Sequence, residues 1–166
     1  MKNPNTFFIT VALISAGILI LGATLVTKTS APELQDSENT NLEVLGEKTH
    51  SWNDIDINGG NVEHTFNIKN SGEGMLEITN FQTSCMCTEV QIDIKGEESP
   101  VFGMHSQSSW KGEIEPGESA SIRVVFDPLF HGPQGVGPIT RLVSFNTNDP
   151  NNKSVELQLT GNVIKK

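Results

Sequence analysis

Alternating hydrophobic and polar positions characterise the chain beyond residue 42. In the stretch 62–69, Val62, His64, Phe66 and Ile68 share one face, and the residues between them are polar. Side chains two positions apart share a face of a β-strand, whereas a helix repeats every 3.6 residues. Because no helical period is sustained beyond residue 30, the pattern predicts an all-β domain.

Further stretches with the same period of two are separated by turn residues such as 70–74 and 116–118. They are centred on Leu76 and Ile78, on Val90, Ile92 and Ile94, on Ala120, Ile122, Val124 and Phe126, on Val143 and Phe145, and on Val155, Leu157 and Leu159. A single sheet cannot bury its apolar face, so two sheets must pack on each other. We predict a β-sandwich of about seven to nine strands over residues 43–164.

A different pattern occupies the N-terminus, where residues 7–26 contain no charge and no proline. About 20 apolar residues cross a bilayer as a helix, whereas a cleaved signal peptide usually has an apolar core of about 7–15. We therefore predict an N-terminal transmembrane helix, an uncleaved signal-anchor over residues 7–27, with cleavage as the alternative. A lipoprotein signal is excluded because no cysteine lies near the end of this segment.

Charge indicates how the anchor is oriented. Lys2 precedes the apolar segment and Lys28 follows it, and the chain then becomes acidic, which favours a cytoplasmic N-terminus over residues 1–6. Residues 28–42 are polar and aperiodic, which is typical of a flexible linker. The predicted protein is a single-pass protein of the cell membrane with an extracytoplasmic C-terminal domain.

The chain is acidic, with 11 Lys and Arg against 20 Asp and Glu and a formal net charge of −9. Residues 1–30 contain two lysines and no acid, so the excess of acid belongs to the predicted exported part. An acidic surface opposes binding to nucleic acid and to anionic lipid headgroups. We expect no nucleic-acid partner, a membrane contact limited to the anchor, and a self-repelling domain that is a monomer.

Three stretches occur in the order HTFNIKNSGEGMLEITNFQTSCMCTEV, IEPGESASIRVVFDP and NTNDP. Together they resemble the bacterial domain of unknown function 1573 family over residues 43–164. The resemblance implies an Ig-like sandwich, often exported and similar to the domains of Hydin-type ciliary and centrosomal proteins, with no established activity. The family motif is usually Cys-Gly-Cys-Thr, and here Met86 replaces the glycine. A methionine argues against any role that needs a positive φ between the two thiols.

Cys85 and Cys87 are the two cysteines of the chain. In a regular strand they would lie about 6.6 Å apart, and a bond between them would close almost no chain, so a structural disulfide is the weakest interpretation. Two thiolates can share a metal ion across a modest turn. Cys, Met and His together favour copper, so the metal hypothesis adds His105 and His131, with Met104 as a weak ligand. The alternative is that the cysteines are small buried hydrophobes.

Two predicted loops, 95–113 and 128–138, are longer than hairpin turns require, and long loops in compact domains tend to be functional. They supply the candidate ligands Met104, His105 and His131. His64 is expected to be an interior or edge histidine, and His50 to precede the sandwich and to be solvated.

No sequence signature of an enzyme is present, since there is no Gly-x-Ser-x-Gly, phosphate loop or His-Glu-x-x-His. Thiol oxidoreductases favour Cys-x-x-Cys at the start of a helix, whereas the residues after Cys87 predict a strand. We expect a non-catalytic protein-interaction or structural module of the cell envelope with an envelope protein as partner. The alternative is a metal-binding protein of copper type. The metal-binding hypothesis would be favoured if the structure brought together Cys85, Cys87, His105 and His131. The protein-interaction hypothesis would be favoured if the two loops lay at different ends of the domain.

Overall fold

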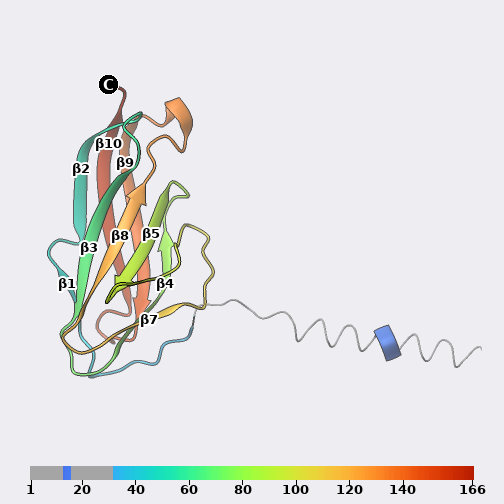
Figure 1. Ribbon diagram of the computed structural model, residues 1–166, viewed down its shortest axis with the longest axis vertical. Coiled ribbons are helices and arrows are strands. Elements are labelled where there is room, and N and C mark those ends of the chain that lie inside the picture. Colours follow the sequence, from blue (N-terminus) through green and yellow to red (C-terminus); the bar gives the residue numbers. More distant parts are fainter. Residues whose placement is uncertain (1–12, 16–31) are drawn as a thin grey trace, which may run out of the picture.

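The computed structural model describes residues 13–15 and 32–166. Within them, ten strands form two five-stranded sheets that pack face to face (Figure 1). The predicted all-β sandwich is confirmed, with ten strands in place of the predicted seven to nine.

The first sheet has the order β1, β3, β8, β5, β6, and each neighbouring pair is antiparallel. Its strands are β1 (Leu42–Leu45), β3 (Val62–Asn70), β8 (Ser119–Phe126), β5 (Thr88–Ile94) and β6 (Glu97–Glu98). The second sheet has the order β2, β10, β9, β4, β7, and here β2 runs parallel to β10. Its strands are β2 (Thr49–Asp56), β10 (Ser154–Ile164), β9 (Gly137–Thr147), β4 (Leu76–Thr83) and β7 (Lys111–Ile114). A short 3-10 helix, η1 (Gly132–Gln134), lies between β8 and β9.

Apart from Phe81, which follows a register shift in β4 and so lies outside the alternation, the buried core consists mainly of the side chains that the alternating pattern assigned to the inner faces. Its largest fully buried members include Phe81, Phe145, Ile78, Ile92, Ile122, Leu157 and Leu159. Fully burying such a side chain stabilises a fold by about 1.5–3 kcal/mol. A smaller second cluster, made of Ile55, Ile57, Cys87, Phe126 and Val163, lies beside the main core.

Strand β2 is absent from the predicted elements because it is a sheet edge with one buried side chain, Ile55, among eight residues. His50 lies within β2, so the prediction that it precedes the sandwich is wrong. Its ring stacks on His64 of β3 with the centroids 3.6 Å apart. Both histidines are half-buried where the edges of the two sheets meet, as expected for His64 and contrary to the solvated position expected for His50.

The end of the predicted flexible linker, residues 36–41, is bonded to the sandwich, so the linker prediction is wrong over this part. We call these residues the strap. Asp36 forms an ion pair with Lys153, and the backbone N–H groups of Glu73 and Gly74 donate to the Asn39 carbonyl at 2.8 and 2.7 Å. The strap is held because its backbone hydrogen bonds are made with the domain rather than with water.

The predicted signal-anchor over residues 7–27 lies outside the described residues, apart from the helical residues 13–15. Among the helices that the structure does describe, none has the length and apolar character needed to cross a bilayer. The anchor and the preceding residues 1–6 therefore remain predictions.

Two connections cross from one sheet to the other at the same end of the sandwich. The turn of residues 84–87 joins β4 to β5, and the loop of residues 127–136 joins β8 to β9. Because Thr88 pairs with Phe126, the two connections leave the first sheet from neighbouring positions. We call this region the cysteine end.

Candidate functional site at the cysteine turn

The turn of residues 84–87, here the cysteine turn, is fixed by hydrogen bonds on both sides. The Thr83 hydroxyl is within hydrogen-bonding distance of the carbonyl oxygens of Cys85 and Thr88, at 3.0 and 2.9 Å. The Thr88 N–H donates to the Cys85 carbonyl at 3.1 Å. On the other side, the N–H of Leu142 in β9 donates to the Ser84 hydroxyl at 2.9 Å. The turn is thereby tied to both sheets.

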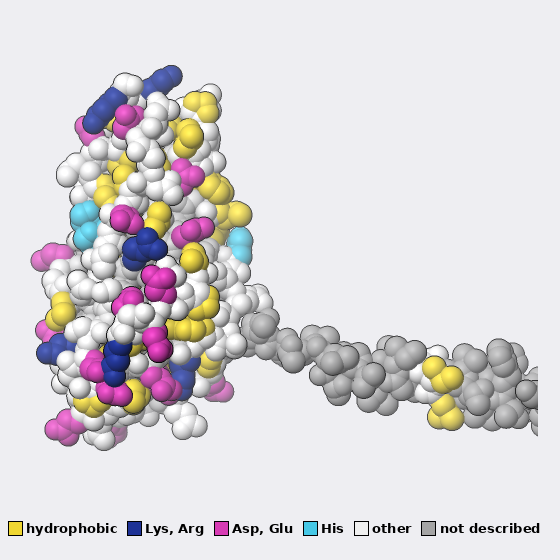
Figure 2. All heavy atoms as spheres, viewed as in Figure 1, with side chains coloured by type: hydrophobic (Ala, Val, Ile, Leu, Met, Phe, Trp, Pro, Cys, Tyr) yellow, Lys and Arg dark blue, Asp and Glu magenta, His cyan; other side chains and the backbone are white. Residues whose placement is uncertain are grey.

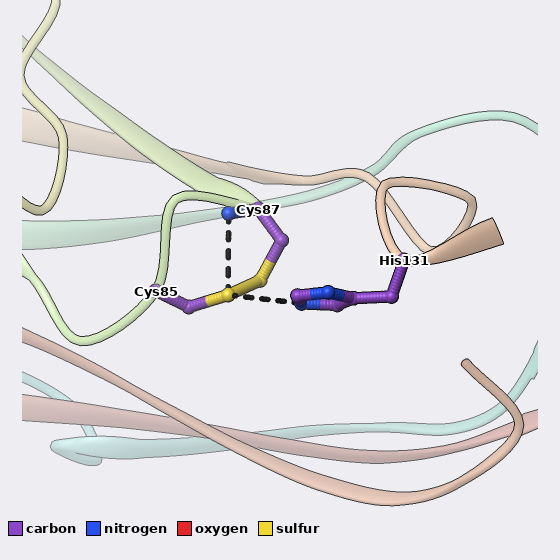
Figure 3. A group of neighbouring side chains, drawn as sticks. All are labelled: Cys85, Cys87 and His131. Carbon is purple, nitrogen blue, oxygen red and sulfur yellow. Dashed lines mark hydrogen bonds between the residues drawn. A yellow bond between two sulfur atoms is a disulfide. The ribbon is translucent and has the colours of Figure 1, made fainter. Parts of the chain in front are cut away.

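Cys85 and Cys87 form a disulfide, which corrects the interpretation of a disulfide as the weakest explanation (Figure 3). The turn brings their Cα atoms to 5.2 Å, closer than the extended spacing of a strand permits. The Cys87 N–H also donates to the Cys85 sulfur at 3.2 Å. Met86, between them, is not among the residues with positive φ, so this conformation does not require glycine.

The two sulfur atoms have different surroundings. Cys87 is 3% exposed and belongs to the second hydrophobic cluster with Phe126 and Val163. Cys85 is half-buried and faces the ring of His131, whose Nε2 lies 3.6 Å from the Cys85 sulfur (Figure 3). Cys87 therefore fits the interpretation of a small buried hydrophobe, whereas Cys85 is the accessible half of the pair.

Arg141 of β9 is a member of the site that sequence reasoning missed. Its Nε donates to the Cys87 sulfur at 3.1 Å, its Nη1 donates to the Thr140 carbonyl at 2.8 Å, and its guanidinium lies 5.2 Å from the centroid of the Phe126 ring. Burial lowers the pKa of Arg141, but a guanidinium remains charged in proteins. The sequence does distinguish Arg141 in one respect, because it is the one charged residue of β9.

The predicted metal ligands converge only in part. The ligand atoms of Cys85, Cys87 and His131 all lie within 4.8 Å of one another, and His105 is not a member of this group. Met104 and His105 instead line a shallow groove beside the turn. The predicted set of five ligands does not form a single site, and the disulfide occupies both sulfur atoms.

Exposed apolar side chains are concentrated on the cysteine turn, in the groove beside it and on the loop of residues 127–136. The large hydrophobic residues exposed in this region are Met86, Val101, Met104, Leu129, Phe130 and Val136. Met86, Val101 and Met104 line the shallow groove, and the Phe130 ring packs edge-on against His131 at 5.2 Å. In Figure 2, hydrophobic side chains lie along the right edge of the upper half of the domain. An exposed apolar patch of this kind is typical of an interaction surface.

Residues 44–100, which include the cysteine turn, match the model of a family described as protein of unknown function (DUF1573). A protein of unknown function from Porphyromonas gingivalis W83 superposes with a TM-score of 0.56 at 19% identity, over 79% of this chain and 50% of that one. The chain thus spans half the length of that protein, and at this identity the likeness shows the fold alone.

Two further solved structures are similar at lower scores. The PapD-like domain 7 of human CEP192 has a TM-score of 0.49 and 15% identity, over 86% of this chain and 98% of that one. The E. coli chaperone DraB has a TM-score of 0.42 and 11% identity, over 76% of this chain and 55% of that one. No curated protein matches the chain.

Proposed function

We propose that the chain is a non-catalytic protein-interaction module of the cell envelope, held at the membrane by residues 7–27, and that its partner binds at the cysteine end. The observation that carries this proposal is the position of the exposed apolar side chains. Residues 32–166 expose eight large hydrophobics, and six of them lie on the cysteine turn, in the groove beside it or on the loop of residues 127–136. The other two are Leu45 and Met75.

The partner that fits this surface is an envelope protein presenting an apolar segment without acidic residues. The groove beside the turn contains one carboxylate, Glu89, and one histidine, His105, among apolar and small polar residues. The whole chain has a net charge of −9, so an acidic partner would be repelled before contact. Apolar contacts would supply most of the affinity, because burial of apolar area is the main favourable term in association.

Site-specific photocrosslinking in native membranes tests the proposal. A photoreactive phenylalanine analogue replaces Phe130 in the full chain, and the matched control places the same analogue at Leu45. We expect a discrete adduct from position 130 that the additional substitution Met86→Ser removes. The crosslinked peptide of the partner should be apolar and should lack Asp and Glu. Equal adducts from both positions, or none from position 130, would contradict the proposal.

Metal binding is a second candidate, favoured by the convergence of the Cys85, Cys87 and His131 ligand atoms. Because the sulfur atoms are joined, the candidate applies to the reduced chain. Competition with a chromophoric copper(I) chelator under reducing conditions tests it. We expect Cys85→Ser and His131→Ala to lower the copper(I) affinity by orders of magnitude. His105→Ala, outside the converging group, is the matched control. An unchanged affinity in Cys85→Ser would exclude this site.

A further inference from the structure

Arg141 is a half-buried cation for which the described part of the chain provides no anionic partner. The ion pairs found in residues 32–166 use Lys95, Lys111, Arg123 and Lys153, and none of them includes Arg141. This is unexpected in a chain with 20 carboxylates and 11 basic side chains. Removing a charge from water is costly unless the charge is paired. The guanidinium instead donates from Nε to a neutral disulfide sulfur at 3.1 Å.

The disulfide that Arg141 contacts has little structural purpose. Its cysteines are two positions apart, so the bond closes almost no chain and removes little entropy from the unfolded state. The surrounding hydrogen bonds from Thr83, Thr88 and Leu142 already define the turn. Stabilisation of the fold therefore does not account for this bond.

Reduction of the disulfide would create the missing anion. A thiolate at Cys87 would form at the sulfur to which Arg141 already donates, in a site that is 3% exposed. Hydrogen bonds to an ionised group are stronger than those to a neutral one. Because the reduced form gains this interaction, the cation favours opening of the disulfide.

The asymmetry of the two sulfur atoms sets the direction of opening. Cys85 is the more accessible sulfur, and Cys87 is buried and in contact with the cation. Thiol–disulfide exchange depends on which sulfur the nucleophile reaches and on how well the leaving thiolate is stabilised. Both factors select attack at Cys85 with Cys87 as the leaving group.

We propose that Cys85–Cys87 is a thiol–disulfide exchange site, at which an incoming thiol attacks Cys85 and Arg141 stabilises the departing Cys87 thiolate. In the first step the incoming thiolate forms a bond to the Cys85 sulfur. The Cys85–Cys87 bond breaks, and its electron pair leaves on the Cys87 sulfur. The product is a mixed disulfide on Cys85 and a thiolate on Cys87.

The co-reactant is a dithiol, or a partner protein with two neighbouring cysteines. In the second step its other thiolate attacks its own sulfur in the mixed disulfide, and Cys85 leaves as a thiolate. The dithiol is thereby oxidised by two electrons to a disulfide, and Cys85–Cys87 is reduced to two thiols. The two protons of the dithiol pass to the solvent or to the two cysteines. This chemistry is stoichiometric and is independent of the docking proposed above.

Glutathione mapping tests the direction of opening. The full chain, purified in detergent with its disulfide formed, is exposed briefly to reduced glutathione and quenched with N-ethylmaleimide. Peptide mass spectrometry then locates both labels. We expect glutathione on Cys85 and maleimide on Cys87. Glutathione mainly on Cys87, an equal distribution, or a disulfide that glutathione does not open would each overturn the proposal.

Equilibration in glutathione redox buffers tests the role of Arg141. We expect Arg141→Gln to shift the equilibrium constant roughly tenfold or more toward the disulfide, because a hydrogen bond to an ionised group is lost. Arg123→Gln is the matched control, since Arg123 forms an exposed ion pair with Glu63. A purely structural role of Arg141 would not move this equilibrium, so an unchanged constant would overturn its assignment. If Arg141→Gln does not fold, Arg141→Lys is used in its place, because lysine retains the positive charge. For Arg141→Lys we expect glutathione on Cys85, as in the wild type. We also expect an equilibrium constant between the wild-type value and the tenfold-shifted value.

Discussion

Single polar residues in the interior determine how the parts of this sandwich are joined. Asp149 is fully buried, and its carboxylate accepts hydrogen bonds from the Leu42 N–H at 2.8 Å, the Asn151 N–H at 2.9 Å and the Asn152 side chain at 2.8 Å. Burial alone would raise the pKa of Asp149, but these hydrogen bonds outweigh it and hold the pKa below its ordinary value of 3.8. The carboxylate thereby joins the first strand to the turn after β9.

Asp149→Ala is expected to lower the free energy of unfolding by about 1–3 kcal/mol, because the buried Leu42 N–H loses its acceptor. Since the folded pKa is depressed, the stabilisation is fully present above pH 3.8 and is lost as the pH falls through the lowered value. Urea denaturation at pH 7 and pH 3 measures both effects. The exposed Asp36→Ala serves as a control. If Asp149→Ala lowers the free energy of unfolding as much at pH 3 as at pH 7, the stabilising role of the Asp149 carboxylate is contradicted.

At the scale of elements, the two sheets meet at one edge through a pair of histidines. His50 of β2 and His64 of β3 stack with their ring planes 7° apart, and His64 also contacts Phe66 edge-on. Burial, and secondarily the charge of His50, lowers the pKa of His64 from its ordinary value of 6.5. The neutral ring is therefore the form that the folded state favours.

Stability should consequently fall when the medium becomes mildly acidic. A depressed folded pKa gives stability that is present above pH 6.5 and is lost as the pH falls through the lowered pKa of His64. We expect a lower denaturation midpoint at pH 5 than at pH 7.5. His64→Gln carries a side chain that does not titrate, so its denaturation midpoint should depend less on pH. If the midpoint of the variant changes with pH as that of the wild type does, His64 is not the cause.

The strands found from the sequence are those with one continuous buried face, such as β3, β8 and β10. Edge strands have no such face, and β2 was missed for that reason. At the site, the metal hypothesis named Cys85, Cys87 and His131, and the structure brings these three side chains together. The disulfide depended on a turn that spacing alone does not reveal. Arg141 was missed because strand pairing brings it to Cys87 from 54 positions away.

At the scale of the whole molecule, the strap and the cysteine turn lie at opposite ends of β4. Gly72 allows the strap to lie against the turn before β4, because a Cβ at this position would be 2.5 Å from the Asn39 carbonyl oxygen. No side chain fits at that distance, so the glycine is required by close approach of the backbone rather than by its φ.

Gly72→Ala is therefore expected to displace the strap without unfolding the sandwich. Limited proteolysis should cleave the variant between residues 36 and 41 faster than the wild type, because the backbone hydrogen bonds to Asn39 are lost. Gly103→Ala is a suitable control, since a Cβ at this position would lie 4.0 Å from the Thr88 carbonyl oxygen, an ordinary contact distance. Equal cleavage rates in the two variants would show that the strap does not depend on Gly72.

The strap also limits how far the domain can lie from the membrane. If residues 7–27 span the membrane, residues 28–35 connect the bilayer to Asp36, which forms an ion pair with Lys153 of the domain. A fully extended chain of this length reaches about 30 Å. The disulfide lies beyond the strap by the length of the eight-residue β4, about 26 Å. A membrane-bound partner would thus meet the cysteine end within a thin layer, where confinement raises its effective concentration and a weak contact is sufficient.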